Sequence, residues 1–110
     1  MTAAPVAELD DDTIVVALDD DSLLEGLSEL RSGVMTQLVQ GNQQLVVDIA
    51  GVSRLSSATV AALLWAKRYC RSRGGHVVVR GPSRDSVDML TRAGLSGVFD
   101  IQLASEVRTP

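Results

Sequence analysis

The segment LVVDIAGVSRLSSATV, residues 45–60, carries the clearest structural signal in this chain. It opens with a dense run of apolar, mostly β-branched residues over Leu45–Ile49, which is typical of a strand buried on both faces. Two adjacent serines, Ser56 and Ser57, precede good helix formers over Ala58–Arg73. The segment therefore predicts a central strand that passes through a short loop into a helix starting at the serines.

The residues before this strand predict a hairpin followed by a helix. Val6–Leu9 and Thr13–Leu18 are β-prone and are separated by an acidic turn, Asp10–Asp12. Ser22 and Glu25 have the spacing of a capping box, so we expect the first helix to begin at Ser22. Apolar residues at three- and four-residue steps give that helix one inward face, made of Leu23, Leu27, Leu30, Val34 and Leu38.

The residues after the second helix predict a β-α-β unit. A short strand over His76–Val79 follows two glycines, and the intervening helix makes it parallel to the central strand. Ser83 is the expected cap of a third helix over Arg84–Ala93. Leu95–Leu103 is expected to form a short edge strand or a packed turn, before a polar tail from Ala104. The residues expected to face inward are Ala61, Leu64 and Trp65, with Ala62 and Tyr69 as further candidates, in the second helix, and Val87, Met89 and Leu90 in the third.

These elements predict an α/β domain with a mixed sheet. An N-terminal hairpin is followed by β-α-β units whose helices pack on at least one face of the sheet. A length of 110 residues with 45% hydrophobic side chains fits a single domain, residues 1–110, with a polar tail from about residue 104.

Composition narrows the classes of partner. Aromatic residues make up 3% of the chain and the net charge is −4, so neither base stacking nor phosphate attraction favours nucleic acid. No signal peptide or membrane span is expected, and the single cysteine, Cys70, excludes an intrachain disulfide. We therefore expect a soluble cytoplasmic protein that binds neither nucleic acid nor membrane.

Charge is distributed unevenly along the chain. Residues 1–53 carry ten acidic and one basic side chain, whereas residues 54–110 carry nine basic and four acidic ones. This asymmetry fits either a protein partner of mixed charge or ordinary solvated faces, and counts alone do not separate the two.

Few residues favour catalysis. The single histidine, His76, falls in a strand-like run, and no phosphate-binding loop, dinucleotide fingerprint or nucleophile elbow is present. The acidic clusters lack the ligand spacing of a calcium loop, so we expect no metal site. Because the motifs named above are missing, we also expect no cofactor and no enzymatic activity. A small hydrolase using Ser57 and His76 is the remaining enzymatic alternative. Cys70 is reactive only if it is exposed, and Trp65 is either core filling or an anchor for a partner.

The two serines at the predicted strand-to-helix junction have a physical use. The first amides of a helix are unpaired and its dipole is positive there, so a phosphate on a serine would be stabilised at the surface. Capping by Ser56 or Ser57 is the ordinary alternative, and both roles are compatible.

At these residues the sequence resembles the STAS domain family, and within it the small bacterial anti-sigma factor antagonists. The family has a strand ending in Asp or Asn, a loop with an internal serine, then Asp-Ser-Ser/Thr-Gly-Leu and a helix, and residues 47–60 follow that register. Residues 18–22 resemble its Leu-Asp-x-x-Thr, and residues 93–99 its closing Gly-Leu-x-x-hydrophobic-Phe. The resemblance implies that Ser57 is phosphorylated.

The resemblance also implies a partner switch. The unphosphorylated antagonist would bind an anti-sigma factor of the serine kinase type and so release a sigma factor, until the kinase phosphorylates Ser57 and reverses binding. The implied partner-binding residues are Asp19, Ser53, Ser56, Ser57, Ala58 and Thr59. Ser56 and Thr59 replace the family's usual Asp and Gly, which favours an alternative in which a diverged STAS module binds a protein or ligand without phosphorylation control.

Overall fold

The structure, a computed structural model, describes residues 6–10, 13–41 and 44–103. It confirms the predicted α/β class. The elements run in the order β1 (Val6–Asp10), β2 (Thr13–Asp19), the 3-10 turn η1 (Asp20–Ser22), α1 (Leu23–Gln40), β3 (Gln44–Gly51), α2 (Ser57–Ser72), β4 (His76–Arg80), α3 (Arg84–Arg92) and β5 (Asp100–Gln102).

The five strands found in the described residues form one mixed sheet in sequence order, β1-β2-β3-β4-β5. β1 is antiparallel to β2, as the hairpin prediction requires, although its turn at Asp11 and Asp12 lies outside the described residues. β2, β3, β4 and β5 are mutually parallel, which confirms the β-α-β unit and identifies the last segment as an edge strand. Their carboxyl ends therefore meet along one edge of the sheet.

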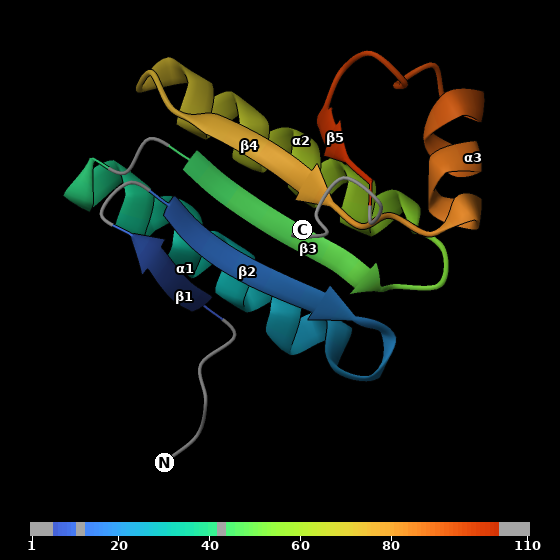
Figure 1. The fold of residues 1–110 in the computed structure, drawn as a ribbon, viewed down its shortest axis with the longest axis horizontal. Coiled ribbons are helices and arrows are strands. Elements are labelled where there is room, and N and C mark those ends of the chain that lie inside the picture. Colours follow the sequence, from blue (N-terminus) through green and yellow to red (C-terminus); the bar gives the residue numbers. More distant parts are fainter. Residues whose placement is uncertain (1–5, 11–12, 42–43, 104–110) are drawn as a thin grey trace, which may run out of the picture.

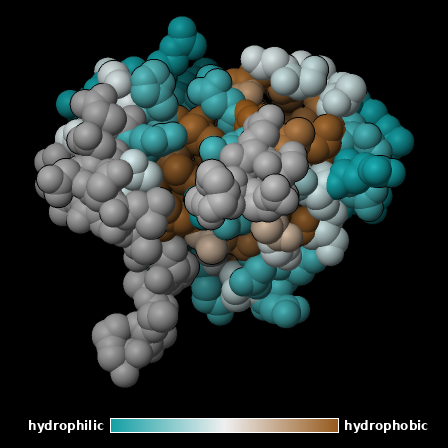
Figure 2. Space-filling model, in the orientation of Figure 1, coloured by the Kyte–Doolittle hydropathy of each residue, from teal (hydrophilic) through white to brown (hydrophobic). Residues whose placement is uncertain are grey.

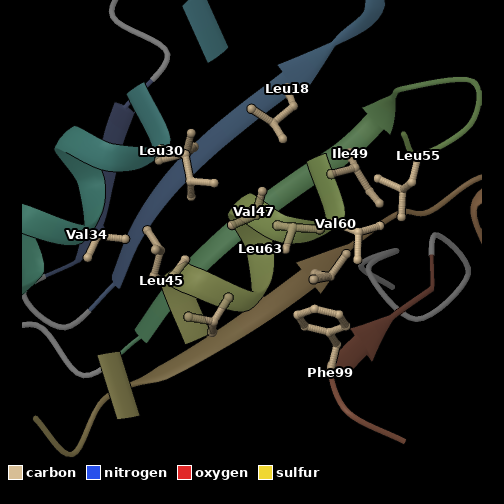
Figure 3. Packing of buried hydrophobic residues seen from close by; sticks show 14 of the residues in the cluster. Leu18, Leu30, Val34, Leu45, Val47, Ile49, Leu55, Val60, Leu63 and Phe99 are labelled. Carbon is tan, nitrogen blue, oxygen red and sulfur yellow. The ribbon is translucent and has the colours of Figure 1, made fainter. Parts of the chain in front are cut away.

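Helices α1 and α2 pack side by side on one face of this sheet, while α3 stands near the β5 edge (Figure 1). Alternate residues of the central strands point into the interface with the helices, and Figure 3 shows Leu45, Val47 and Ile49 of β3 among them. A Cβ atom on Gly33 of α1 would lie 2.8 Å from Val16 Cγ2 of β2, so this glycine lets the helix approach the sheet closely.

The buried face of α2 differs from the sequence-based prediction. Thr59, Val60, Leu63, Ala66 and Cys70 are buried, whereas Ala61, Leu64 and Tyr69 are exposed and Trp65 is half-buried. The prediction that Ala61, Leu64 and Tyr69 face inward was therefore wrong, whereas Ala62 and Trp65 are partly buried against the core. The segment is apolar on several sides, so hydrophobicity alone did not define its orientation.

α1 begins at Leu23, directly after the predicted start at Ser22, but a 3-10 turn precedes it. Asp19, and not Ser22, is the N-cap, and it begins the turn η1 that leads into α1. The Asp19 carboxylate accepts hydrogen bonds from both the amide and the hydroxyl of Ser22, at 2.9 Å each. The Asp19 carboxylate therefore caps this helical segment one turn before Ser22, the serine of the predicted capping box. Of the predicted inward face, Leu30 and Val34 are buried, whereas the side chain of Leu38 lies outside the described part.

The opposite face of the sheet combines an apolar row with an ion pair. Val15, Val46 and Val78 align across β2, β3 and β4, and hydrophobic surface is visible among hydrophilic residues on this side (Figure 2). One step further along the strands, Arg80 Nη2 lies 3.0 Å from Asp48 Oδ2. Within the described ranges, no helix has both the length and the apolar character needed to cross a membrane.

Candidate functional site

The residues singled out from the sequence gather where the parallel strands end. β2 leads into η1 and α1, β3 leads into α2, and β4 leads into α3, so three helical segments begin along the same edge of the sheet. The amino ends of these segments carry partial positive charge and unpaired amides. We refer to this edge, which comprises Asp19–Ser22, Ser53–Thr59 and Ser83, as the switch edge.

The amino end of α2 separates the roles of the two adjacent serines. Ser56 is the N-cap, and its hydroxyl oxygen accepts a hydrogen bond from the Thr59 amide at 3.1 Å. Its carbonyl accepts from the Val60 amide at 2.9 Å. Ser57 is the first residue of the helix and is exposed, and within the described part of the chain its hydroxyl has no hydrogen-bond partner. The capping role therefore belongs to Ser56, and the hydroxyl of Ser57 stays available.

Thr59 supports this helix start from inside the protein. Its side chain is fully buried, and its hydroxyl oxygen lies 3.0 Å from the hydroxyl oxygen of Ser56. A buried hydroxyl is costly unless it has a partner, so this contact satisfies the group that Thr59 introduces. Because the side chain is buried, it does not form part of the exposed surface of this edge.

A hydrogen-bond chain joins the three loops of the switch edge. Asp20, in η1, accepts hydrogen bonds from both the amide and the hydroxyl of Ser53, which precedes α2. The carbonyl of Ser53 in turn accepts a hydrogen bond of 2.6 Å from the hydroxyl of Ser83, the N-cap of α3. The loop that carries Ser56 and Ser57 is therefore held from both sides.

Asp19 lies on the same edge but acts locally. It pairs with Gly51 across β2 and β3, and its carboxylate caps η1. A Cβ atom on Gly51 would lie 2.7 Å from the Cβ of Asp19, so only glycine fits between the two strands here. The contact between this acidic segment and the α2 loop comes from Asp20 instead.

Sequence reasoning missed Asp20 and the second role of Ser83. In the sequence, Asp20 belongs to an acidic cluster that is typical of turns and helix caps, and Ser83 is expected to act only as a helix cap. The predicted strand order could have indicated both contacts, because residues that follow neighbouring parallel strands meet at one edge of the sheet. Of the predicted partner-binding residues, the structure exposes Ser53, Ser56, Ser57 and Ala58 together and leaves Asp19 half-buried beside them.

Comparison with known families gives this edge a context. A family model described as "Mlab, STAS domain" matches residues 6–104, nearly the whole chain. The chain belongs to the STAS domain family. No curated protein matches the sequence.

Solved structures share the fold of this STAS domain at low sequence identity. A Thermotoga maritima protein, TM1081, is 17% identical, with a TM-score of 0.75 over 96% of this chain and 86% of that one. Phosphorylated SpoIIAA from Bacillus is 18% identical, with a TM-score of 0.66 over 94% of this chain and 95% of its own. A serine-to-glutamate variant of RsbS from Moorella thermoacetica is 20% identical, with a TM-score of 0.71 over 91% and 88% of the two chains.

The structure also decides between the roles that the sequence left open for two residues of this STAS domain, Cys70 and His76. Cys70 lies on the buried face of α2, and burial raises the pKa of its thiol from 9.0 to about 11, so at neutral pH it is a protonated core residue. His76 begins β4 and pairs with Gln44, at the edge of the sheet opposite to the switch edge. Because Ser57 lies beyond the carboxyl end of β3, the two side chains do not form a catalytic pair.

Proposed function

We propose that this STAS domain is an anti-sigma factor antagonist whose switch edge binds an anti-sigma factor of the serine kinase type. Binding releases a sigma factor, and phosphorylation of Ser57 ends it. The family assignment and the shared fold of SpoIIAA, an anti-sigma factor antagonist solved in phosphorylated and unphosphorylated forms, support this proposal. Such a protein regulates transcription through a protein partner in the cytoplasm, without catalysis and without contacting nucleic acid or membrane itself.

The accessibility of Ser57 carries the proposal. Ser56 provides the cap, so modification of the neighbouring hydroxyl leaves the helix start intact. The amides of Thr59 and Val60 are already bonded to Ser56, whereas within the described residues those of Ser57 and Ala58 have no acceptor. These two amides and the positive end of the α2 dipole would stabilise a phosphate at the surface.

Phosphorylation would change this contact surface in charge and in hydration. A phosphoserine carries about −1.5 to −2 charges and three strong acceptor oxygens. At an interface that group must lose water, and it repels any carboxylate placed opposite to it. Asp20, which is hydrogen-bonded to Ser53 on the same edge, is itself acidic and cannot neutralise the added charge. The modification therefore weakens binding without unfolding the domain.

The contact between Ser56 and Thr59 favours a second candidate function. The two residues that depart from the family's usual Asp and Gly are bonded to each other, and the threonine is buried. The fold thus accommodates both changes and presents a neutral cap. In this second candidate, the switch edge binds its partner constitutively and Ser57 is not a phosphorylation site.

Affinity for an anti-sigma factor separates the two functions. Each anti-sigma factor of the serine kinase type from the source organism is titrated with wild-type protein and with Ser57→Asp, Ser57→Ala and Ser32→Asp. Ser32 is exposed on α1, away from the switch edge, and it controls for added charge. We expect Ser57→Asp to weaken binding by about tenfold or more, whereas Ser57→Ala and Ser32→Asp change it by less than about threefold.

The outcomes are distinct. Equal affinity of Ser57→Asp and wild type would contradict phosphate control and favour the constitutive module. Failure of every such anti-sigma factor to bind wild-type protein would contradict the antagonist function. Thermal unfolding of each variant shows whether a loss of binding reflects a loss of fold.

A further inference from the structure

The outer surface of the helical layer contains a groove that the proposed switch does not use. It runs between α1 and α2 and encloses a hollow of about 830 Å³. Leu27, Arg31 and Met35 line it from α1, at four-residue steps, and Trp65, Tyr69 and Arg73 line it from α2. We call this feature the helix groove. It starts about one turn beyond Ser57 and extends to the opposite end of α2.

The groove exposes large apolar and aromatic side chains. Met35 is 51% exposed and Tyr69 is 46% exposed. Trp65 is half-buried, and its ring centroid lies 4.9 Å from that of Tyr69 in a tilted arrangement. Paired aromatic residues and methionine on a surface are enriched at the centres of protein interfaces. This composition favours a protein partner that inserts apolar side chains.

The groove is also basic, in a chain whose net charge is negative. Arg31 and Arg73 line it, and the guanidinium carbon of Arg31 lies 6.0 Å from the Trp65 ring centroid. A second hollow of about 440 Å³ shares Trp65 and adds Lys67, Arg68 and Arg71. No carboxylate lines either hollow among the described residues. An acidic partner would therefore meet complementary charge along the carboxyl-terminal half of α2.

We propose that the helix groove is a second docking site, which binds an acidic amphipathic helix of a partner protein. The space between two neighbouring helices fits a third helix whose apolar residues recur at i, i+3, i+4 and i+7. Those anchors contact Met35, Trp65 and Tyr69, while carboxylates on the flanks of the helix pair with Arg31 and Arg73. This site goes beyond the proposed function and lets one domain hold a second protein while the switch edge is free or occupied.

Intrinsic fluorescence tests the site directly, because Trp65 is the only tryptophan in the chain. The probe is a tryptophan-free helical peptide of about 16 residues, the length of α2, with leucines at the stated spacing and glutamates elsewhere. A peptide of identical composition with scrambled leucine positions is its control. We expect saturable, one-to-one binding that shifts Trp65 emission and weakens with added salt, and no such binding by the scrambled peptide.

Charge reversal then assigns the contact, with calorimetry as an independent readout. Arg31→Glu and Arg73→Glu should each weaken peptide binding by about tenfold, whereas Arg84→Glu, at an exposed residue of α3, should change it by less than about twofold. Ser57→Asp should also retain peptide binding, which separates this site from the switch. Melting curves identify any variant that has lost its fold, and Met35→Glu then replaces a misfolded arginine variant.

Several outcomes would overturn the proposal. These are no Trp65 response, equal binding of both peptides, and an equal loss of affinity in Arg84→Glu. A response to phosphatidylglycerol vesicles without a response to the peptide would identify a membrane surface instead. A response to concentration of the protein alone, with salt-sensitive self-association, would identify a second copy of this chain as the occupant.

Discussion

Replacing Ser56 by alanine tests the account of the α2 start in energetic terms. The substitution removes the hydroxyl that accepts from the Thr59 amide, and loss of such a cap costs about 1 kcal/mol. It also removes the partner of the fully buried Thr59 hydroxyl, and an orphaned buried hydroxyl costs at least about 1 kcal/mol more. We therefore expect Ser56→Ala to lower the free energy of unfolding by about 2 kcal/mol.

A double-mutant cycle separates the two contributions. In Thr59→Val the buried hydroxyl is absent, so adding Ser56→Ala should cost only the cap, about 1 kcal/mol, and the coupling energy should be about 1 kcal/mol. Urea unfolding followed by far-UV circular dichroism gives each free energy, provided that the m-value is unchanged. A cost below about 0.5 kcal/mol for Ser56→Ala, or additive effects within error, would refute the role assigned to this pair.

Two further predictions concern the buried face of α2. Leu63→Ala should cost about 2–5 kcal/mol because Leu63 is fully buried, whereas Leu64→Ala, at a side chain 37% exposed, should cost less than about 1 kcal/mol in the same urea assay; equal costs would contradict the helix orientation. Burial raises the pKa of Cys70 from 9.0 to about 11, so the folded state holds a proton that the unfolded state loses. The contribution of the Cys70 thiol to the free energy of unfolding is therefore complete below pH 9. It falls between pH 9 and about 11, by up to about 1 kcal/mol per pH unit. A Cys70→Ala variant should therefore lose stability less steeply than wild type over that pH range.

The central strands of the sheet could be predicted from the local sequence, because their composition is typical of buried strands. The run Leu45–Ile49 is β-branched, bounded by polar breakers, and too short for a helix, so both its type and its burial follow from composition. Ser83 likewise marks the start of α3 through a local hydrogen bond to the Ser86 amide at 3.1 Å. Interactions within a few residues are the ones that a sequence pattern encodes directly.

The features that sequence patterns missed depend on competition between neighbouring residues for one role, or on contacts between residues far apart in the sequence. Asp19 and Ser22 are both acceptable caps, and only the path of the chain leaving β2 selects the aspartate. In α2, Leu63 and Leu64 are adjacent and equally apolar, so only packing against the sheet decides which is buried. The bond between Asp20 and Ser53 spans 33 residues, and no local pattern contains it.

The most direct test of the switch is to locate the phosphate itself. The protein is purified from its native cells during growth and under stress, its intact mass is measured, and any addition of about 80 Da is mapped by fragmentation. We predict one phosphate on Ser57, and none on the capping Ser56 or on the Asp20-bound Ser53. Phosphate at either of those serines, or no phosphate under any condition while an anti-sigma factor is still bound and released, would contradict the account.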